Sequence, residues 1–222
     1  AMTNSSGSAQ GVAQAGSAPA EKVEFFFDPM CPWAWMTSRW MLEVEQVRPV
    51  EVTWHIMSLS VLNRGRELPE HYMDMMARGM GPVRTVVAAE QIVGPEAVLP
   101  LYTAMGTRIH LQDRNNDADE LTGAIAEAVA ELGLPAEVGA AAESEQWDAL
   151  VEASHHAGMD PVGDQVGTPV VHIGDVALFG PVVSPAPKGE AAGILFDGVV
   201  ACARTPGFFE LKRSRFVDPI FD

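Results

Sequence analysis

The sequence predicts an α/β protein in which two segments of strands and helices flank a long helical block. Three observations support this prediction. Strand-like runs enclose a helical repeat near the N-terminus, two more short strands precede a helix near the C-terminus, and helix formers fill the region between them. The 222 residues, 47% of them hydrophobic, suffice for one large domain or for a domain that carries an inserted second one.

The first segment is predicted to form a strand, a helix and a second strand. The run from Val23 to Phe27 is short, apolar and aromatic, as buried strands are. Apolar residues then recur at three- and four-residue spacing over 33–47, and Pro32 suits the first turn of that helix. Residues 50–57 alternate between apolar and polar, which is typical of a half-buried strand. The result is a βαβ unit with Cys31 at the start of its helix.

The last segment is predicted to form two strands and a helix. Short apolar and β-branched runs occur at 166–173 and 176–179, and Gly174-Asp175 between them is a hairpin turn signal. Residues 187–204 then follow a helical pattern. This is a ββα unit.

Together, the βαβ and ββα units have the element order of a thioredoxin fold. The region from 84 to 158 is rich in helix formers, and no strand pattern appears between 63 and 160. We therefore expect a thioredoxin-fold domain formed by 22–62 and 160–222, with 63–159 as an inserted all-helical domain.

The composition narrows the possible partners. The chain has 30 acidic residues against 14 basic ones, a formal net charge of −16. Such a charge repels phosphate backbones and anionic lipids, so we expect neither nucleic acid nor membrane as a partner. No window approaches 18 successive apolar residues, which argues against a transmembrane helix.

Residues 1–21 begin with a small and polar stretch and are expected to be a disordered leader, with Ala1-Met2 as the remnant of a tag. They lack the basic start and apolar run of a secretory signal, which favours a cytoplasmic location where thiols stay reduced. We therefore expect no disulfide between Cys31 and Cys202, the two cysteines of the chain.

Cys31 is the candidate reactive residue. A thiol at a helix N-terminus lies near unpaired N–H groups and the positive end of the helix dipole, which favour the nucleophilic thiolate. The alternative is a buried, inert cysteine at a strand end. Thr168-Pro169 favours the reactive interpretation, because thioredoxin folds place a cis-proline at the start of the corresponding strand, facing the active cysteine. The Thr168 backbone would then pair with an extended thiol substrate.

Several separated runs resemble the actinobacterial mycothiol-dependent nitroreductases, which belong to the wider DsbA-like group. The matching runs include FFFDPMCPWAWMTSRWMLEVEQVR, WHIMSLSVLN, GPVRTVVAAEQ, LYTAMGTRIH, SHHAGMD, VGTPVV, ALFGPVVS and FFELKR. The resemblance covers about 22–222. It implies a thioredoxin fold with an inserted helical domain, a cytoplasmic location, mycothiol as the reducing thiol and a homodimer.

Ala34 departs from this resemblance, because the best-known members carry Cys-Pro-Trp-Cys where this chain has Cys-Pro-Trp-Ala. The second cysteine of such a pair resolves the mixed disulfide formed by the first. Without it, an external thiol must release Cys31, which suits a monothiol cycle. Ala34 is either natural or a substitution introduced to trap the mixed disulfide. Cys202 lies in an apolar helical stretch and is expected to pack rather than to resolve.

Other candidates for the thiol- and substrate-binding surface are Pro32, Trp33, His110, Asn63 and Tyr72. Pro32 stiffens the turn at the thiol, and the resemblance implies that Trp33 lines the substrate pocket. It also implies that His110 faces the active-site cleft, where a histidine can hold a mycothiol carboxylate or supply a proton to a reduced nitro group. A surface or capping histidine is the alternative.

Three functions remain open on this sequence. The first is a mycothiol-dependent reduction of disulfides or nitro compounds through Cys31. The second is a thiol transferase or isomerase of the kappa glutathione transferase type, in which the protein only activates the cofactor thiol. The third is a redox-inactive binding protein. No phosphate-binding loop, dinucleotide fingerprint or zinc spacing occurs in the sequence, so we expect no nucleotide, flavin or metal.

Overall fold

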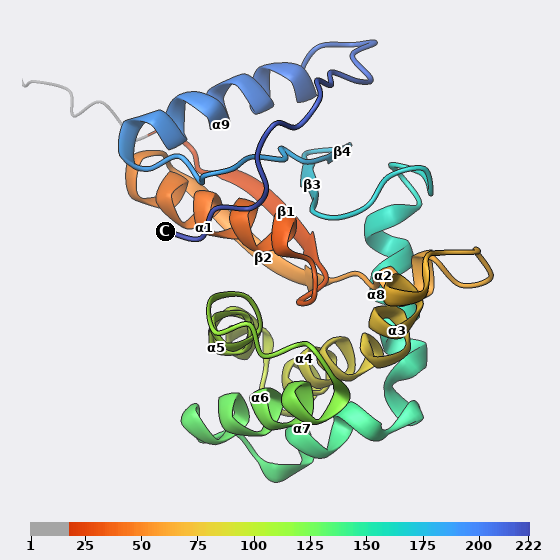
Figure 1. Ribbon diagram of the computed structural model, residues 1–222. Coiled ribbons are helices and arrows are strands. Elements are labelled where there is room, and N and C mark those ends of the chain that lie inside the picture. The colour runs from red at the N-terminus through yellow and green to blue at the C-terminus, as the bar shows by residue number, and fades with distance from the viewer. Residues whose placement is uncertain (1–17) are drawn as a thin grey trace, which may run out of the picture.

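The computed structural model describes residues 18–222 and contains a four-stranded sheet surrounded by helices (Figure 1). The strands are β1 (Glu21–Phe27), β2 (Val50–Ile56), β3 (Val170–Ile173) and β4 (Val176–Phe179). Their order in the sheet is β2-β1-β3-β4. β2 pairs parallel with β1, whereas β3 is antiparallel to both β1 and β4. The predicted strand–helix–strand unit and the later hairpin are therefore confirmed, but the first hairpin strand begins at Val170 rather than at 166.

The helices are α1 (Pro32–Val47), α2 (Leu59–Leu62), α3 (Glu70–Arg78), α4 (Met80–Ile92), α5 (Val98–Gly106), α6 (Ala118–Glu131), α7 (Ala136–Ala140), α8 (Asp148–Met159) and α9 (Gly189–Ala203). Every regular element between β2 and β3 is helical, as predicted. The predicted helix at 99–109 is α5, which starts at Val98 and passes after Gly106 into a π-helical turn, Thr107–Leu111.

The central strand β1 is buried on both faces, because its side chains alternate between two clusters. Phe25 and Phe27 join the larger core cluster, whereas Phe26 joins a smaller one with Met159 and Val170. α1 and α9 lie side by side on one face (Figure 1), where the indole N–H of Trp40 donates to the Ala192 carbonyl at 3.0 Å.

α5 packs on the same core as the start of α1. The Tyr102 ring stacks on Phe27, with ring centroids 3.8 Å apart, and meets the Trp35 ring edge-on at 5.5 Å. Gly106 lies directly against Trp35, where a side chain would overlap the indole. This contact brings the π-helical turn and its His110 to the N-terminal end of α1.

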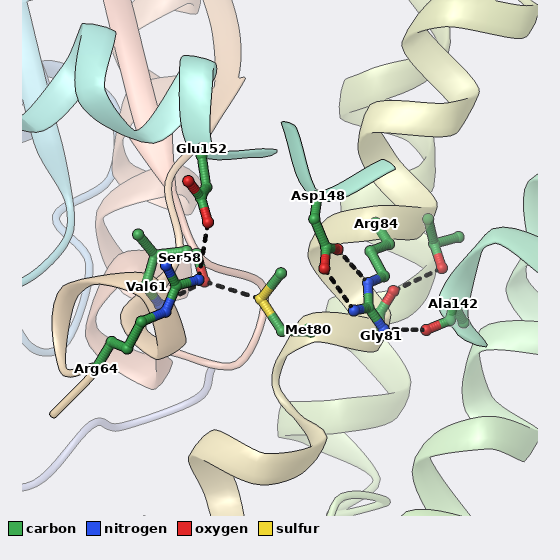
Figure 2. A network of polar contacts seen from close by, with 10 residues as sticks. Ser58, Val61, Arg64, Met80, Gly81, Arg84, Ala142, Asp148 and Glu152 are labelled. Atoms are coloured by element: carbon green, nitrogen blue, oxygen red, sulfur yellow. Dashed lines mark hydrogen bonds and ion pairs between the residues drawn. The ribbon is translucent and has the colours of Figure 1, made fainter. Parts of the chain in front are cut away.

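Polar contacts join the helices between β2 and β3, as Figure 2 shows. The guanidinium of Arg84 in α4 donates to both carboxylate oxygens of Asp148 at 2.6 and 2.9 Å. Arg64, after α2, pairs with Glu152 of α8 at 2.8 Å. These bonds connect α8, which leads back to the sheet, to the preceding helices.

Most of the expected leader, 1–21, lies outside the described residues, and Glu21 already belongs to β1. No helix in the described part of the chain is both long and apolar enough to cross a bilayer.

Candidate active site

Cys31 lies in the turn between β1 and α1. The turn is closed by a hydrogen bond from the Cys31 N–H to the Asp28 carbonyl at 3.0 Å, and Pro32 is the first residue of the helix. Cys31 is the N-cap of α1, and its sulfur accepts the backbone N–H of Ala34 at 3.4 Å. The sulfur therefore occupies the capping position that an oxygen usually fills, next to the unpaired N–H groups of the first turn.

Thr168 and Pro169 form the opposite wall of the thiol site. The Thr168-Pro169 peptide bond is cis, as expected, and β3 begins at the next residue. The Cys31 thiol donates to the Thr168 carbonyl at 3.5 Å, while the Thr168 hydroxyl donates to the Phe26 carbonyl at 3.2 Å. The structure therefore brings the cysteine turn and the cis-proline segment together.

The electrostatics of Cys31 differ from the expectation. The residue is only 8% exposed, and burial raises the pKa of its thiol to about 11. The Ala34 N–H lowers this pKa and the nearby Asp28 carboxyl raises it, but removal from water has the largest effect. The expectation that the helix N-terminus keeps Cys31 ionised is therefore wrong, because burial of the thiol outweighs the helix N–H groups.

Asp28 is a buried carboxyl that sequence reasoning missed. One of its oxygens accepts the Met30 N–H at 2.9 Å and the other accepts the Leu59 N–H at 2.8 Å. Burial raises its pKa to about 6, against the lowering effect of these two N–H groups. Asp28 thus ties the cysteine turn to the start of α2. Its position directly after a buried aromatic strand and before a proline was the available signal.

His110 lies beside the cysteine turn. Its Nε2 is 2.8 Å from the Pro29 carbonyl oxygen, a distance at which the ring must carry the proton on Nε2 and donate it. Burial lowers the pKa of His110 to about 4, so the ring is neutral at pH 7. His110 therefore holds the turn two residues before Cys31 as a hydrogen-bond donor rather than as a cation.

Trp33, within the Cys-Pro-Trp-Ala motif, and Trp35, directly after it, differ in their surroundings. Trp33 is partly exposed, and the Arg215 guanidinium lies 4.7 Å from its ring. Trp35 is buried, and the Arg39 guanidinium covers its ring at 3.9 Å. Arg39 donates to the hydroxyls of Ser38 and Thr103. Sequence reasoning missed Arg215, because it lies far along the chain in a segment without regular structure.

The remaining candidates lie differently. Ala34 is fully buried. Asn63 caps the C-terminus of α2 and donates to the Leu59 carbonyl, while Tyr72 is 47% exposed on α3 with its ring against His71. Within residues 18–222, neither has a hydrogen bond or ring contact with Cys31, Trp33 or His110. Both cysteines are free, as expected, and Cys202 is half-buried in α9 rather than a core residue.

Solved structures resemble this fold. A probable DsbA oxidoreductase, SCO1869 of Streptomyces coelicolor, matches with a TM-score of 0.55 and 16% identity over 88% of this chain and 94% of its own. A 2-hydroxychromene-2-carboxylate isomerase matches with 0.54 and 16% over 82% and 95%. The cytosolic disulfide reductase DsbM of Pseudomonas aeruginosa, solved with GSH, matches with 0.50 and 17% over 81% and 99%. The predicted α/β, DsbA-like thioredoxin fold is confirmed.

Sequence comparison gives the family. The uncharacterized protein Rv2286c of Mycobacterium tuberculosis (strain ATCC 25618 / H37Rv) is 27% identical over 196 residues, which cover 87% of this chain and 82% of that protein. The sequence model of the Rv2466c-like family, described as mycothiol-dependent nitroreductase Rv2466c, matches residues 30–213 and so includes both Cys31 and Pro169. The chain therefore belongs to the Rv2466c-like family of mycothiol-dependent nitroreductases, which are thioredoxin-fold oxidoreductases.

Proposed function

We propose that the protein is a thiol-disulfide oxidoreductase that uses mycothiol as its reductant and Cys31 as its only reacting thiol. One observation carries the proposal: the Cys31 sulfur lies at the N-terminus of α1 and faces the Thr168 carbonyl beside the cis bond to Pro169. The N–H groups of the first helical turn stabilise a thiolate once water or a substrate reaches the sulfur. The Thr168 main chain offers a partner for an extended thiol compound.

The proposed cycle has two exchange steps. In the first, the Cys31 thiolate attacks a disulfide, so that one Cys31–S bond to a small thiol forms, the old S–S bond breaks and one thiolate leaves. In the second, a mycothiol thiolate attacks the mixed disulfide, forms a new disulfide with the bound group and releases the Cys31 thiolate. Two thiols supply two electrons, which also suffice to reduce a nitro group to a nitroso group with loss of water.

Ala34 determines that the second step is intermolecular. Its side chain is a methyl group in the position where a dithiol enzyme has the resolving cysteine, and it is fully buried. Cys202, the other thiol of the chain, lies in α9. In the proposed cycle an external thiol releases Cys31, because the motif has no second thiol.

Intact mass measurement tests the proposal. The wild-type protein incubated with mycothiol disulfide gains one mycothiol adduct, which a small thiol removes. Cys31→Ser forms no adduct, while Cys202→Ser, the matched control, forms the same adduct as the wild type. Absence of the adduct on the wild type, under conditions in which Cys31 can be alkylated, contradicts the proposal.

The same variants separate the other candidate functions. A transferase or isomerase, in which the protein only activates a cofactor thiol, retains its activity in Cys31→Ser. A redox-inactive binding protein has a Cys31 that reacts with alkylating agents like a free thiol and forms no mixed disulfide.

The proposal further places the protein in the cytoplasm as a homodimer, as the family resemblance implies. It divides the described chain into a thioredoxin-fold domain, 22–62 and 160–222, and a helical insertion, 63–159. Asn63 and Tyr72 would then approach the substrate from the insertion boundary. Sedimentation analysis tests the dimer, and the KM values of Asn63→Ala and Tyr72→Phe test these two residues.

A further inference from the structure

The last segment of the chain, residues 214–222, crosses the thiol site. After α9 the chain runs back without regular secondary structure and passes in front of α1 (Figure 1). Its Arg215 guanidinium covers Trp33 at 4.7 Å, and its Phe221 ring stacks on His110 with centroids 5.9 Å apart. Trp33 lies two residues after Cys31, and His110 holds the turn before Cys31 through the Pro29 carbonyl. We call residues 214–222 the strap.

The contacts that hold the strap lie at the surface. The Ser184 hydroxyl donates to the Asp218 carbonyl at 3.0 Å and accepts the Ile220 N–H at 2.8 Å. Lys188 pairs with Asp222 at 3.3 Å, with both side chains largely exposed. Exposed pairs of this kind contribute little to stability. Phe221 is still 37% exposed, so even the most apolar anchor of the strap is incompletely buried. The strap is therefore easy to displace.

Arg215 brings an unneutralised charge to the thiol. It is close enough to Cys31 for its positive charge to lower the pKa of that thiol, although burial outweighs this effect. Arg215 takes part in none of the ion pairs formed within residues 18–222. The net charge of −16 repels anions from the chain, whereas a cation without a carboxylate partner over Trp33, two residues after Cys31, attracts them locally.

We propose that the strap is a movable wall of the thiol site, and that Arg215 makes this wall favour anionic reaction partners of Cys31. The inference rests on the proposed function, because it concerns access to the same sulfur. When the strap is bound, it covers the cysteine turn through its contacts with Trp33 and His110. When the strap is displaced, the sulfur becomes accessible to water and to small thiol compounds.

Alkylation of the two cysteines tests both parts of the inference. Iodoacetamide and iodoacetate are similar in size and differ in charge, and each forms a C–S bond with the thiolate while iodide leaves. Rates are measured site by site by peptide mass, so that Cys202 serves as an internal reference in every sample. The proteins are the full chain, a chain ending at residue 213, and the full-length variants Arg215→Gln, Phe221→Ala and Phe216→Ala.

Removal of the strap is expected to raise the iodoacetamide rate at Cys31 at least tenfold and to leave the rate at Cys202 within twofold. Phe221→Ala raises the Cys31 rate in the same direction. Phe216→Ala makes the same chemical change within the strap at a ring that is 78% exposed, and leaves the rate unchanged. If the shortened chain keeps its circular dichroism spectrum and Cys31 still reacts as slowly as in the full chain, the strap is not a cover.

Arg215→Gln is expected to lower the ratio of iodoacetate to iodoacetamide rates at Cys31 several-fold, with the ratio at Cys202 unchanged. An unchanged ratio at Cys31 overturns the preference for anions. Neither measurement requires mycothiol. A chain ending at residue 213 can therefore be alkylated quickly at Cys31 and still form no adduct with mycothiol disulfide. That result contradicts the proposed function but supports the inference that the strap covers the thiol.

Discussion

The sulfur of Cys31 lies 3.5 Å from the main-chain oxygen of Thr168, although 137 residues separate the two along the chain. The carbonyl accepts the thiol proton, and the sulfur in turn accepts the Ala34 N–H at 3.4 Å. Loss of the proton removes the first bond and strengthens the second, because a thiolate is the better acceptor. The same two groups that hold the resting thiol therefore favour its reorientation toward the helix on ionisation.

Asp28→Asn is expected to make Cys31 more reactive. The Asp28 carboxyl has a pKa of about 6, so it is charged at pH 8, where its charge raises the pKa of the Cys31 thiol. Asparagine removes this charge and keeps one oxygen that can accept a backbone N–H. The pH profile of Cys31 alkylation by iodoacetamide should move to lower pH, with a rate at pH 8 about threefold higher.

Asp74→Asn is the control for Asp28→Asn, because it removes the same charge from an exposed position on α3. It should leave the alkylation rate of Cys31 unchanged. An equal acceleration by both substitutions would mean that net charge, rather than the buried carboxyl, controls the thiol.

Ala34→Cys is expected to convert the monothiol site into a dithiol site. The Ala34 backbone N–H already contacts the Cys31 sulfur, so a thiol at this position lies within reach of a mixed disulfide on Cys31. The high effective concentration of this second thiol should shorten the lifetime of the mycothiol adduct by about tenfold or more. The lifetime is measured by quenching samples with acid at set times and determining their intact mass. The product is an intramolecular disulfide, two hydrogens lighter than the reduced protein.

Ala34→Ser is the matched control, since it adds a group of similar shape without a thiol. It should retain the long-lived adduct of the parent protein. A short-lived adduct in Ala34→Ser would show that crowding of the site, rather than a resolving thiol, releases the bound group.

The fold follows from local patterns to a large extent. The hairpin strand 176–179 is predicted with the bounds that the structure gives it. The Gly174-Asp175 turn precedes this strand and Gly180-Pro181 follows it. β1 begins at Glu21 rather than Val23, since backbone pairing with β2 extends beyond the apolar run. α2 was not predicted because a helix of four residues has no periodicity to detect.

The site is less predictable, because its electrostatics depend on groups from distant parts of the chain. The cysteine at a helix start and the Thr168-Pro169 step are visible in the sequence, and the structure brings them together. The raised pKa of Cys31 is not visible, since it comes from burial in the folded site. Arg215 lacks any motif and is identified only by its place over Trp33.

His110→Gln is expected to make stability less sensitive to acid. A histidine whose pKa is lowered to about 4 in the folded state supports folding above its ordinary value of 6.5, and this support is lost progressively as pH falls from 6.5 to 4. The glutamine amide can still donate to the Pro29 carbonyl but does not titrate. Between pH 7 and 4.5, the free energy of unfolding should fall by about 2 kcal/mol more in the wild type than in the variant.

Urea unfolding at both pH values provides this comparison. Asp28 acts in the opposite direction, because a raised carboxyl pKa gives stability that is lost as pH rises from about 4 through 6. The free energy of unfolding of the wild type therefore changes less with pH than His110 alone predicts. The comparison should use the difference in this free energy between the wild type and His110→Gln at each pH. Parallel losses in the two proteins would show that folding does not lower the pKa of His110.

Gly106→Ala is expected to disturb the contact that positions the π-helical turn. A Cβ at Gly106 would overlap the Trp35 ring, which cannot move freely because Arg39 covers one face and Tyr102 meets its edge. Overpacking of this kind should lower the free energy of unfolding by about 2–3 kcal/mol.

Gly198→Ala in α9 makes the same substitution where a Cβ meets open space, and should raise stability by about 0.5–1 kcal/mol. Since Trp35 also lies beside His110, only Gly106→Ala should weaken the hold on the cysteine turn and accelerate alkylation of Cys31. Equal stabilities of the two variants would contradict this close packing of α5 on α1.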